Sequence, residues 1–125
     1  PSVGWSGPNV LAGLKAAVAE PFPLVTGQDA ELAALQRIVT GDQYMTVYKA
    51  IKPQAERAAD VAVALVRGEA VTAPSMIEGT PTELLEPVSV TVDNILETVV
   101  ADGFWSIDES CTPAYADACV AAGLV

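Results

Sequence analysis

The feature that most constrains the fold of this chain is the alternation of helix-like and strand-like segments within residues 1–49. Apolar residues recur at helical spacing over 10–18 and again over 30–39, which predicts two amphipathic helices. Short apolar runs at 24–26 and 45–48 follow these helices, which predicts two strands. Helices that alternate with strands are typical of an α/β fold with a parallel sheet, and we expect that fold class here.

After Lys49 the pattern changes and predicts a less regular arrangement. Pro53 suits the first turn of a helix, and the residues from Thr80 to Glu83 have the pattern of a helix-capping box. We expect a helix over 53–67, then a polar surface connection over 69–80 and one helical turn after Thr80. A strand over 85–90 follows, and then a helix over 92–101 that is capped by Thr91 and closed by Gly103. The last expected helix covers 112–122.

The net charge of −10 lies entirely in the second half of the chain and excludes several functions. Residues 1–67 contain six basic and six acidic side chains, whereas residues 68–125 contain ten acidic side chains and no basic one. Such a chain would repel a nucleic-acid backbone and an anionic lipid surface, so we expect neither partner. The absence of histidine excludes a Ser-His-Asp triad and an imidazole metal site.

The apolar segments are too short for direct membrane insertion, because a spanning helix needs roughly 20 apolar residues. The sequence begins at Pro1 with neither methionine nor a charged, apolar leader. We therefore expect that any targeting segment has been removed or was not included.

A candidate ligand site lies where the strand at 24–26 gives way to the helix at 30–39, at Gly27-Gln28-Asp29. Open parallel sheets bind ligands at this kind of edge. Two interpretations of Asp29 are open: it caps the following helix, or it points with Gln28 into a cleft. A carboxylate accepts two hydroxyl hydrogen bonds, and an amide both donates and accepts, so the second interpretation suits a polyol or a sugar.

Lys49 ends the strand at 45–48 and is expected at the same edge of the sheet. It is either a solvated strand-end lysine or a cation that faces Asp29 across the cleft and donates to the same ligand. Tyr48, on an alternating strand, is expected to face the opposite side. Phe104 and Trp105 either anchor the C-terminal segment or stack on a sugar ring.

Near the C-terminus, Ser106 and Glu109 have the spacing of a capping box. Cys111 and Cys119 are either unrelated small apolar residues or the partners of a disulfide, which would imply an oxidising compartment. No general base or nucleophile is arranged for catalysis, and we expect no enzyme activity, no cofactor and no metal. The residues alone therefore predict a small α/β ligand-binding domain.

Two blocks, Val25 to Val39 and Met45 to Lys49, closely resemble the xylose-type periplasmic sugar-binding proteins of ABC transporters. The resemblance continues through the helix after Pro53, through the 84–88 segment and to Asp102-Gly103-Phe104, and so covers about residues 10–105. Proteins of this family have two α/β lobes and are much longer than this chain. The beginning of their first lobe has no counterpart here. The resemblance therefore implies a C-terminal portion of such a protein.

The resemblance also implies a fold and a set of ligands. The fold is an incomplete type I periplasmic-binding-protein fold, with residues 1–49 in the second lobe, 50–84 crossing to the first lobe, and 85–125 returning to the second. The sugar ligands carried over are Gln28, Asp29 and Lys49, and Asp29 is expected to clamp adjacent hydroxyls.

The resemblance implies a bacterial-type protein outside the cytoplasm, in the periplasm or at the cell surface. Its implied partners are a pentose or hexose and the membrane permease of an ABC transporter. Sugar binding closes the two lobes and creates the surface that the permease recognises. The alternative is a free-standing acidic α/β module that binds a protein and no sugar.

Overall fold

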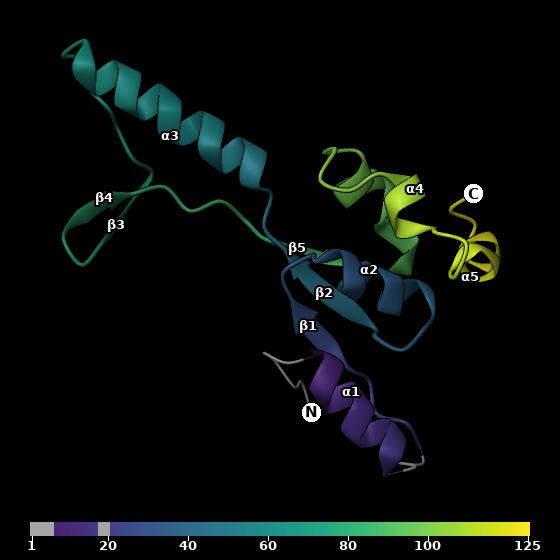
Figure 1. Cartoon of the computed structure of the whole chain (residues 1–125). Helices are drawn as coiled ribbons and strands as arrows, with labels where there is room; N and C mark the ends of the chain where they lie inside the picture. Colours follow the sequence, from purple (N-terminus) through teal and green to yellow (C-terminus); the bar gives the residue numbers. More distant parts are fainter. Residues whose placement is uncertain (1–6, 18–20) are drawn as a thin grey trace. The chain divides into compact units, whose positions relative to one another are not determined.

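The computed structural model describes residues 7–17 and 21–125 and confirms a mixed α/β architecture (Figure 1). The chain divides into two compact units. The first combines Pro1–Lys49 with Pro87–Val125, and the second is Ala50–Glu86. The chain therefore leaves the first unit after Lys49 and returns to it at Pro87.

A three-stranded sheet forms the centre of the first unit. Its strands are β1 (Thr26–Gln28), β2 (Met45–Tyr48) and β5 (Val88–Val90), in the order β1-β2-β5. The first pair is parallel, as expected, but β5 runs antiparallel to β2. The reason lies in the register, because Val88 at the start of β5 pairs with Tyr48 at the end of β2. The returning chain re-enters at the edge where it left, so it must run backwards along β2.

The first unit also contains helices, some of which pack on this sheet and bury its core. They are α1 (Gly7–Ala16), α2 (Leu32–Val39), the 3₁₀-helix η1 (Val92–Asn94), the π-helix η2 (Leu96–Val100), α4 (Ile107–Ser110) and α5 (Ala116–Ala121). α2 contacts β2 and α4, and η2 contacts β5 (Figure 1). Leu35 of α2, Val90 of β5, and Ile95 and Val99 next to and within η2 are completely buried. The apolar spacing that predicted these helices therefore marks the faces that form the core.

The helix predicted over 92–101 is present but is not a regular α-helix. The N–H groups of Val100 and Ala101 donate to carbonyls five residues back, at 3.2 and 3.1 Å. The Thr98 hydroxyl donates to the Asn94 carbonyl at 2.6 Å and occupies the acceptor that an α-helical N–H at position 98 would use. A threonine that bonds back in this way competes with the helical pattern, and the turn widens to a π-helix.

The two ends of the first unit differ from the sequence expectation. The first helix ends at Ala16, and Val18, the predicted last residue, lies outside the described residues. The last helix begins at Ala116 and not at Thr112, because the 112–115 segment forms a turn in which the Tyr115 N–H donates to the Thr112 carbonyl at 2.8 Å.

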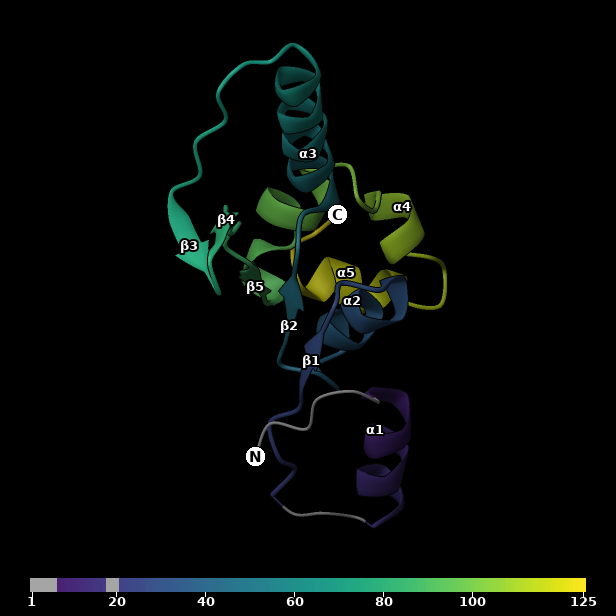
Figure 2. The same ribbon diagram turned by 90° about the vertical axis from the view of Figure 1, so that its left-hand side faces the viewer.

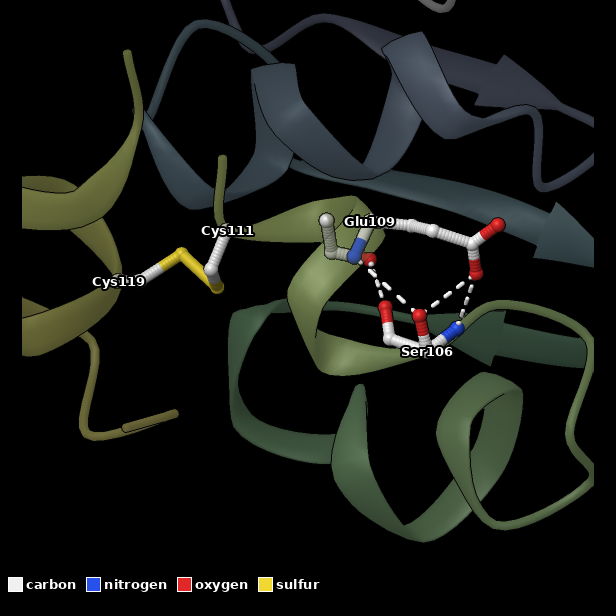
Figure 3. Close-up of a disulfide and its surroundings, with 5 residues drawn as sticks. Ser106, Glu109, Cys111 and Cys119 are labelled. Carbon is white, nitrogen blue, oxygen red and sulfur yellow. Dashed lines mark hydrogen bonds between the residues drawn. A yellow bond between two sulfur atoms is a disulfide. The ribbon is translucent and has the colours of Figure 1, made fainter. Parts of the chain in front are cut away.

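This turn brings the two cysteines together. Cys111 directly follows α4, Cys119 lies within α5, and the two sulfurs are joined in a disulfide with the Cα atoms 5.9 Å apart (Figure 3). α4 itself starts with the predicted capping box, in which the Glu109 N–H donates to the Ser106 hydroxyl at 3.2 Å and the Ser106 N–H donates to the Glu109 carboxylate at 2.9 Å. Hydrogen bonds from the Ser106 hydroxyl and backbone N–H lower the pKa of Glu109.

The second unit contains α3 (Ile51–Val66) and a hairpin of β3 (Ser75–Ile77) with β4 (Thr80–Thr82). The hairpin replaces the loop and the helical turn expected over 69–83. Glu78 and Gly79 both have positive φ, at 48° and 79°, as the two-residue turns that suit a twisted hairpin require. Glu83 does not cap a helix, because its carboxylate instead accepts from Arg57 of α3 at 2.7 Å.

No residue of this second unit is buried. α3 exposes Val63, Leu65 and Val66, although its apolar side chains recur at the spacing of an inward face. Figure 2 shows the connection over 67–74 that leads from α3 to the hairpin. The second unit thus presents apolar surface without forming a hydrophobic core of its own. Among the described residues, the helices are too short or too polar for any of them to cross a membrane.

Candidate functional site

Asp29 and Lys49 meet at the carboxyl edge of the sheet. Asp29 directly follows β1, Lys49 directly follows β2, and the parallel pairing of these strands brings their ends side by side. The Lys49 Nζ lies 2.8 Å from the Asp29 Oδ1. The two side chains remain 51% and 58% exposed, so the pair stays open to a ligand.

The backbone of Asp29 explains why its side chain does not cap the helix that follows. α2 begins at Leu32 with Glu31 in the N-cap position, and the helix receives no side-chain cap. Asp29 has a φ of 68°, in the left-handed region that aspartate tolerates better than most residues. Its carboxylate pairs with Lys49 and not with the N–H groups of α2. The capping interpretation of Asp29 is therefore wrong.

Gln28, the third residue expected at the site, is the last residue of β1 and is exposed. Its amide makes no hydrogen bond to Asp29, Lys49 or any other side chain in the described part of the chain. The structure thus brings Asp29 and Lys49 into contact and leaves Gln28 beside them at the same edge.

The arrangement places an acceptor and a donor next to each other. The carboxylate of Asp29 has lone pairs beyond those used by Lys49, and the ammonium group has further N–H donors. Two hydroxyls on neighbouring carbons can therefore bind together, one donating to Asp29 and the other accepting from Lys49. This is the pattern of a polyhydroxy ligand.

The sequence reasoning missed two polar side chains that are buried behind this edge. Thr46 is completely buried, and its hydroxyl donates to the Asp29 carbonyl at 2.8 Å. Gln43 is also buried, and it accepts from the Arg37 Nε and donates to the Met45 carbonyl, both at 3.0 Å. In β2, Thr46 and Tyr48 are buried whereas the apolar Met45 and Val47 are half-buried, so alternation along the sequence could not have identified Thr46.

The aromatic pair of the returning segment contacts the same region. The Trp105 Nε1 donates to the Ala30 carbonyl at 2.8 Å, which fits the anchoring interpretation of this pair. Phe104 packs against Tyr48 with ring centroids 5.3 Å apart, and the Tyr48 hydroxyl donates to Asp102 at 3.1 Å. Burial, together with the hydrogen bond and the negative charge of Asp102, raises the pKa of Tyr48 to about 12.

A hollow of about 340 Å³ lies at the opposite end of the strands. Val25 and Tyr44, which come just before β1 and β2, line it, and it contains none of the three candidate ligands. Within residues 7–17 and 21–125, no group of three or more acidic or cysteine side chains is placed to hold a metal ion. The candidate site is therefore the open edge at Gln28, Asp29 and Lys49.

No protein-family model matches the chain, but individual proteins do. It is 46% identical over 84 residues to the D-xylose-binding periplasmic protein of Haemophilus influenzae, a match covering 64% of this chain and 25% of the relative. The protein of the same name from Escherichia coli is 43% identical over 84 residues, covering 64% of this chain and 26% of the relative. The chain thus spans about a quarter of the length of these relatives.

Solved structures show the same fold. A carbohydrate transporter solute-binding protein from Chloroflexus aurantiacus, in complex with D-glucose, superposes with a TM-score of 0.65 at 28% identity, covering 86% of this chain and 35% of that protein. An ABC transporter solute-binding protein from Clostridium phytofermentans, with bound β-D-glucose, gives a TM-score of 0.74 at 24% identity, covering 83% and 34%. The described α/β structure is thus a partial piece of this binding-protein fold.

Both kinds of likeness agree with the residues from which the family was first suggested. These two sequence matches are to proteins named for xylose binding, and the two structural matches are to solute-binding proteins of transporters. Sequence and fold together confirm that the chain resembles the C-terminal part of the xylose-type periplasmic sugar-binding proteins.

Proposed function

We propose that the full-length protein containing this chain is the substrate-binding component of a carbohydrate ABC transporter and binds a monosaccharide such as xylose. The observation that carries the proposal is the open Asp29–Lys49 pair at the carboxyl edge of the sheet. Relatives named for xylose binding, and a glucose complex among the related structures, support the same ligand class.

In this proposal Asp29 accepts hydrogen bonds from adjacent sugar hydroxyls, Lys49 donates to one of them, and Gln28 fixes the orientation of the ring. The protein performs no chemistry on the sugar. A hydrogen-bonding site of this kind discriminates strongly, because a ligand that lacks a hydroxyl leaves a polar group without a partner.

The lobe assignment is part of the same proposal. Residues 1–49 and 85–125 belong to the second lobe, and residues 50–84 cross to the first. The division of the chain after Lys49 and before Pro87 supports it, as does the absence of buried residues in the second unit. Apolar faces such as that of α3 need a partner, and the remainder of the first lobe would supply one.

The proposed location is outside the cytoplasm, where a membrane permease receives the loaded protein. The relatives are named as periplasmic proteins, and a disulfide persists in oxidising compartments. The permease is the partner expected for a transporter component.

Calorimetric titration of the full-length protein with xylose, glucose and arabinose tests the proposal. We expect one of these sugars to bind, and Asp29→Ala to weaken its binding by more than about 1 kcal/mol, because sugar hydroxyls lose a charged acceptor. Asp42→Ala is the matched control. Asp42 forms a similar exposed ion pair with Lys15 at 2.7 Å, but it precedes β2 and so lies away from the carboxyl edge.

Two results would contradict the proposal. If the full-length protein bound no pentose or hexose and instead bound a protein through this segment, the interaction-module alternative would hold. If Asp29→Ala and Asp42→Ala left the affinity equally unchanged, the carboxyl edge would not be the sugar site.

A further inference from the structure

We propose that Thr46 and Trp105 are positioning residues for the sugar site. They hold the turn between β1 and α2, and so present the Asp29 carboxylate beside Lys49. This inference rests on the proposed function and adds two residues that do not touch the sugar themselves. It concerns the geometry of the turn and not the identity of the ligand.

The turn from Gln28 to Glu31 needs external support because of its backbone geometry. Asp29 has a φ of 68°, which is unfavourable for a residue with a side chain. The ion pair to Lys49 supplies little restraint, since both partners are about half exposed and exposed ion pairs contribute about 0–1 kcal/mol. α2 receives no side-chain cap that would fix its first turn.

Thr46 supplies the first restraint from β2. Its side chain is completely buried, and its hydroxyl donates to the Asp29 carbonyl at 2.8 Å. The Asp29 N–H donates to the Val47 carbonyl at 2.9 Å, so both backbone groups of Asp29 are held by consecutive residues of β2. Two bonds on opposite sides of one α-carbon fix both the position of Asp29 and its left-handed conformation.

Trp105 supplies the second restraint from a distant part of the chain. Its Nε1 donates to the carbonyl of Ala30, the residue after Asp29, at 2.8 Å across 75 positions of sequence. Ala30 is itself buried. The neighbouring Phe104 packs on Tyr48 of β2, so the segment that carries the indole is fixed to the same sheet. The segment that returns after Pro87 thus holds the turn between β1 and α2, which carries Asp29.

The variants that test this inference remove one hydrogen bond and keep the shape. Thr46→Val loses only the hydroxyl, and valine suits a buried strand position. Thr46→Ser keeps the hydroxyl and loses a methyl group. Trp105→Phe keeps an aromatic ring and loses the N–H donor. Each is made in the full-length protein, both alone and combined with Asp29→Ala, and urea unfolding checks that every variant is folded.

The measurement is calorimetric affinity for whichever of xylose, glucose and arabinose binds the wild-type protein most tightly. We expect Thr46→Val and Trp105→Phe each to weaken binding about fivefold, the equivalent of one hydrogen bond. Thr46→Ser retains the affinity. In the Asp29→Ala background, Thr46→Val changes the affinity less than about twofold, because residues that act through one another are not additive.

The inference fails if Thr46→Val binds as the wild type does, or loses the same factor with and without Asp29. Those results would leave the sugar site in place, provided that Asp29→Ala alone weakens binding. If Asp29→Ala alone has no effect, the proposed site and the positioning role are both wrong. A loss of affinity in Thr46→Ser equal to that in Thr46→Val would also overturn the role of the hydroxyl.

Discussion

Replacing Gly27 with alanine tests how closely the buried polar side chains approach the strand that carries the site. A Cβ at this position would lie 2.5 Å from the Gln43 Nε2 and 3.1 Å from the Thr46 Oγ1. A separation of 2.5 Å is too short for these atoms, so Gln43 must move. Gln43 is buried and held by hydrogen bonds with Arg37 and with the Met45 carbonyl, so it cannot move without breaking them.

The cost follows from what Gln43 loses. Two hydrogen bonds contribute about 1 kcal/mol each, and a buried amide left without partners costs about 1–3 kcal/mol more. Alanine recovers about 0.5 kcal/mol, because it restricts the unfolded chain more than glycine does. We therefore expect Gly27→Ala to lower the free energy of unfolding by about 2.5–4.5 kcal/mol.

Urea unfolding of the full-length protein measures this change. The control is Gly13→Ala in α1, where an added Cβ would meet no atom within 4 Å. We expect that control to raise stability by about 0.5–1 kcal/mol, because alanine favours a helix interior. The double variant Gly27→Ala with Gln43→Ala should cost less than the sum of its parts, since the clash is gone. A Gly27→Ala protein within about 0.5 kcal/mol of the wild type would refute the steric reasoning.

The remaining predictions concern the disulfide and Tyr48. Replacing both Cys111 and Cys119 with serine should lower the free energy of unfolding by about 2.5 kcal/mol, because the disulfide no longer closes a short loop in the unfolded chain. Equal stability of the wild-type protein with and without reductant would contradict this prediction. The pKa of Tyr48 rises from 10.0 to about 12, so its contribution to stability is complete below pH 10 and is lost as the pH rises towards 12. Unfolding curves over this range should show less pH dependence in Tyr48→Phe, and a wild-type tyrosine titration complete by pH 11 would contradict the shift.

Local patterns predicted most of the elements in the first unit. The apolar spacing of Leu35 and Ile38 predicted α2, and the run from Met45 to Tyr48 predicted β2. The first strand was placed two residues too early, since β1 is Thr26–Gln28, and Gly27 lies within it. A glycine usually interrupts a strand, but here it makes room for Gln43, a contact that local sequence does not reveal.

The candidate site was predictable in residue type but not in its arrangement. Asp29 and Lys49 were expected at one edge because parallel strands end together, and the structure places them in contact. The residues behind them were not found, because Thr46 and Trp105 act through hydrogen bonds to the backbone of a distant turn. The hairpin over 75–82 was missed as well, since Thr80-Pro81-Thr82-Glu83 fits a capping box locally while Glu83 binds Arg57 in the structure.

The α/β alternation, the acidic second half and the family resemblance can all be recognised in the amino-acid sequence. All three depend on residue type and on short spacing along the chain. The three-dimensional fold was needed to establish the antiparallel direction of β5, the left-handed turn at Asp29, the Asp29–Lys49 contact and the disulfide across the 112–115 turn. Each of these depends on how segments that do not adjoin in the sequence pack against one another. Side chains that meet only through the fold leave no periodic signal, so spacing along the sequence could not reveal them.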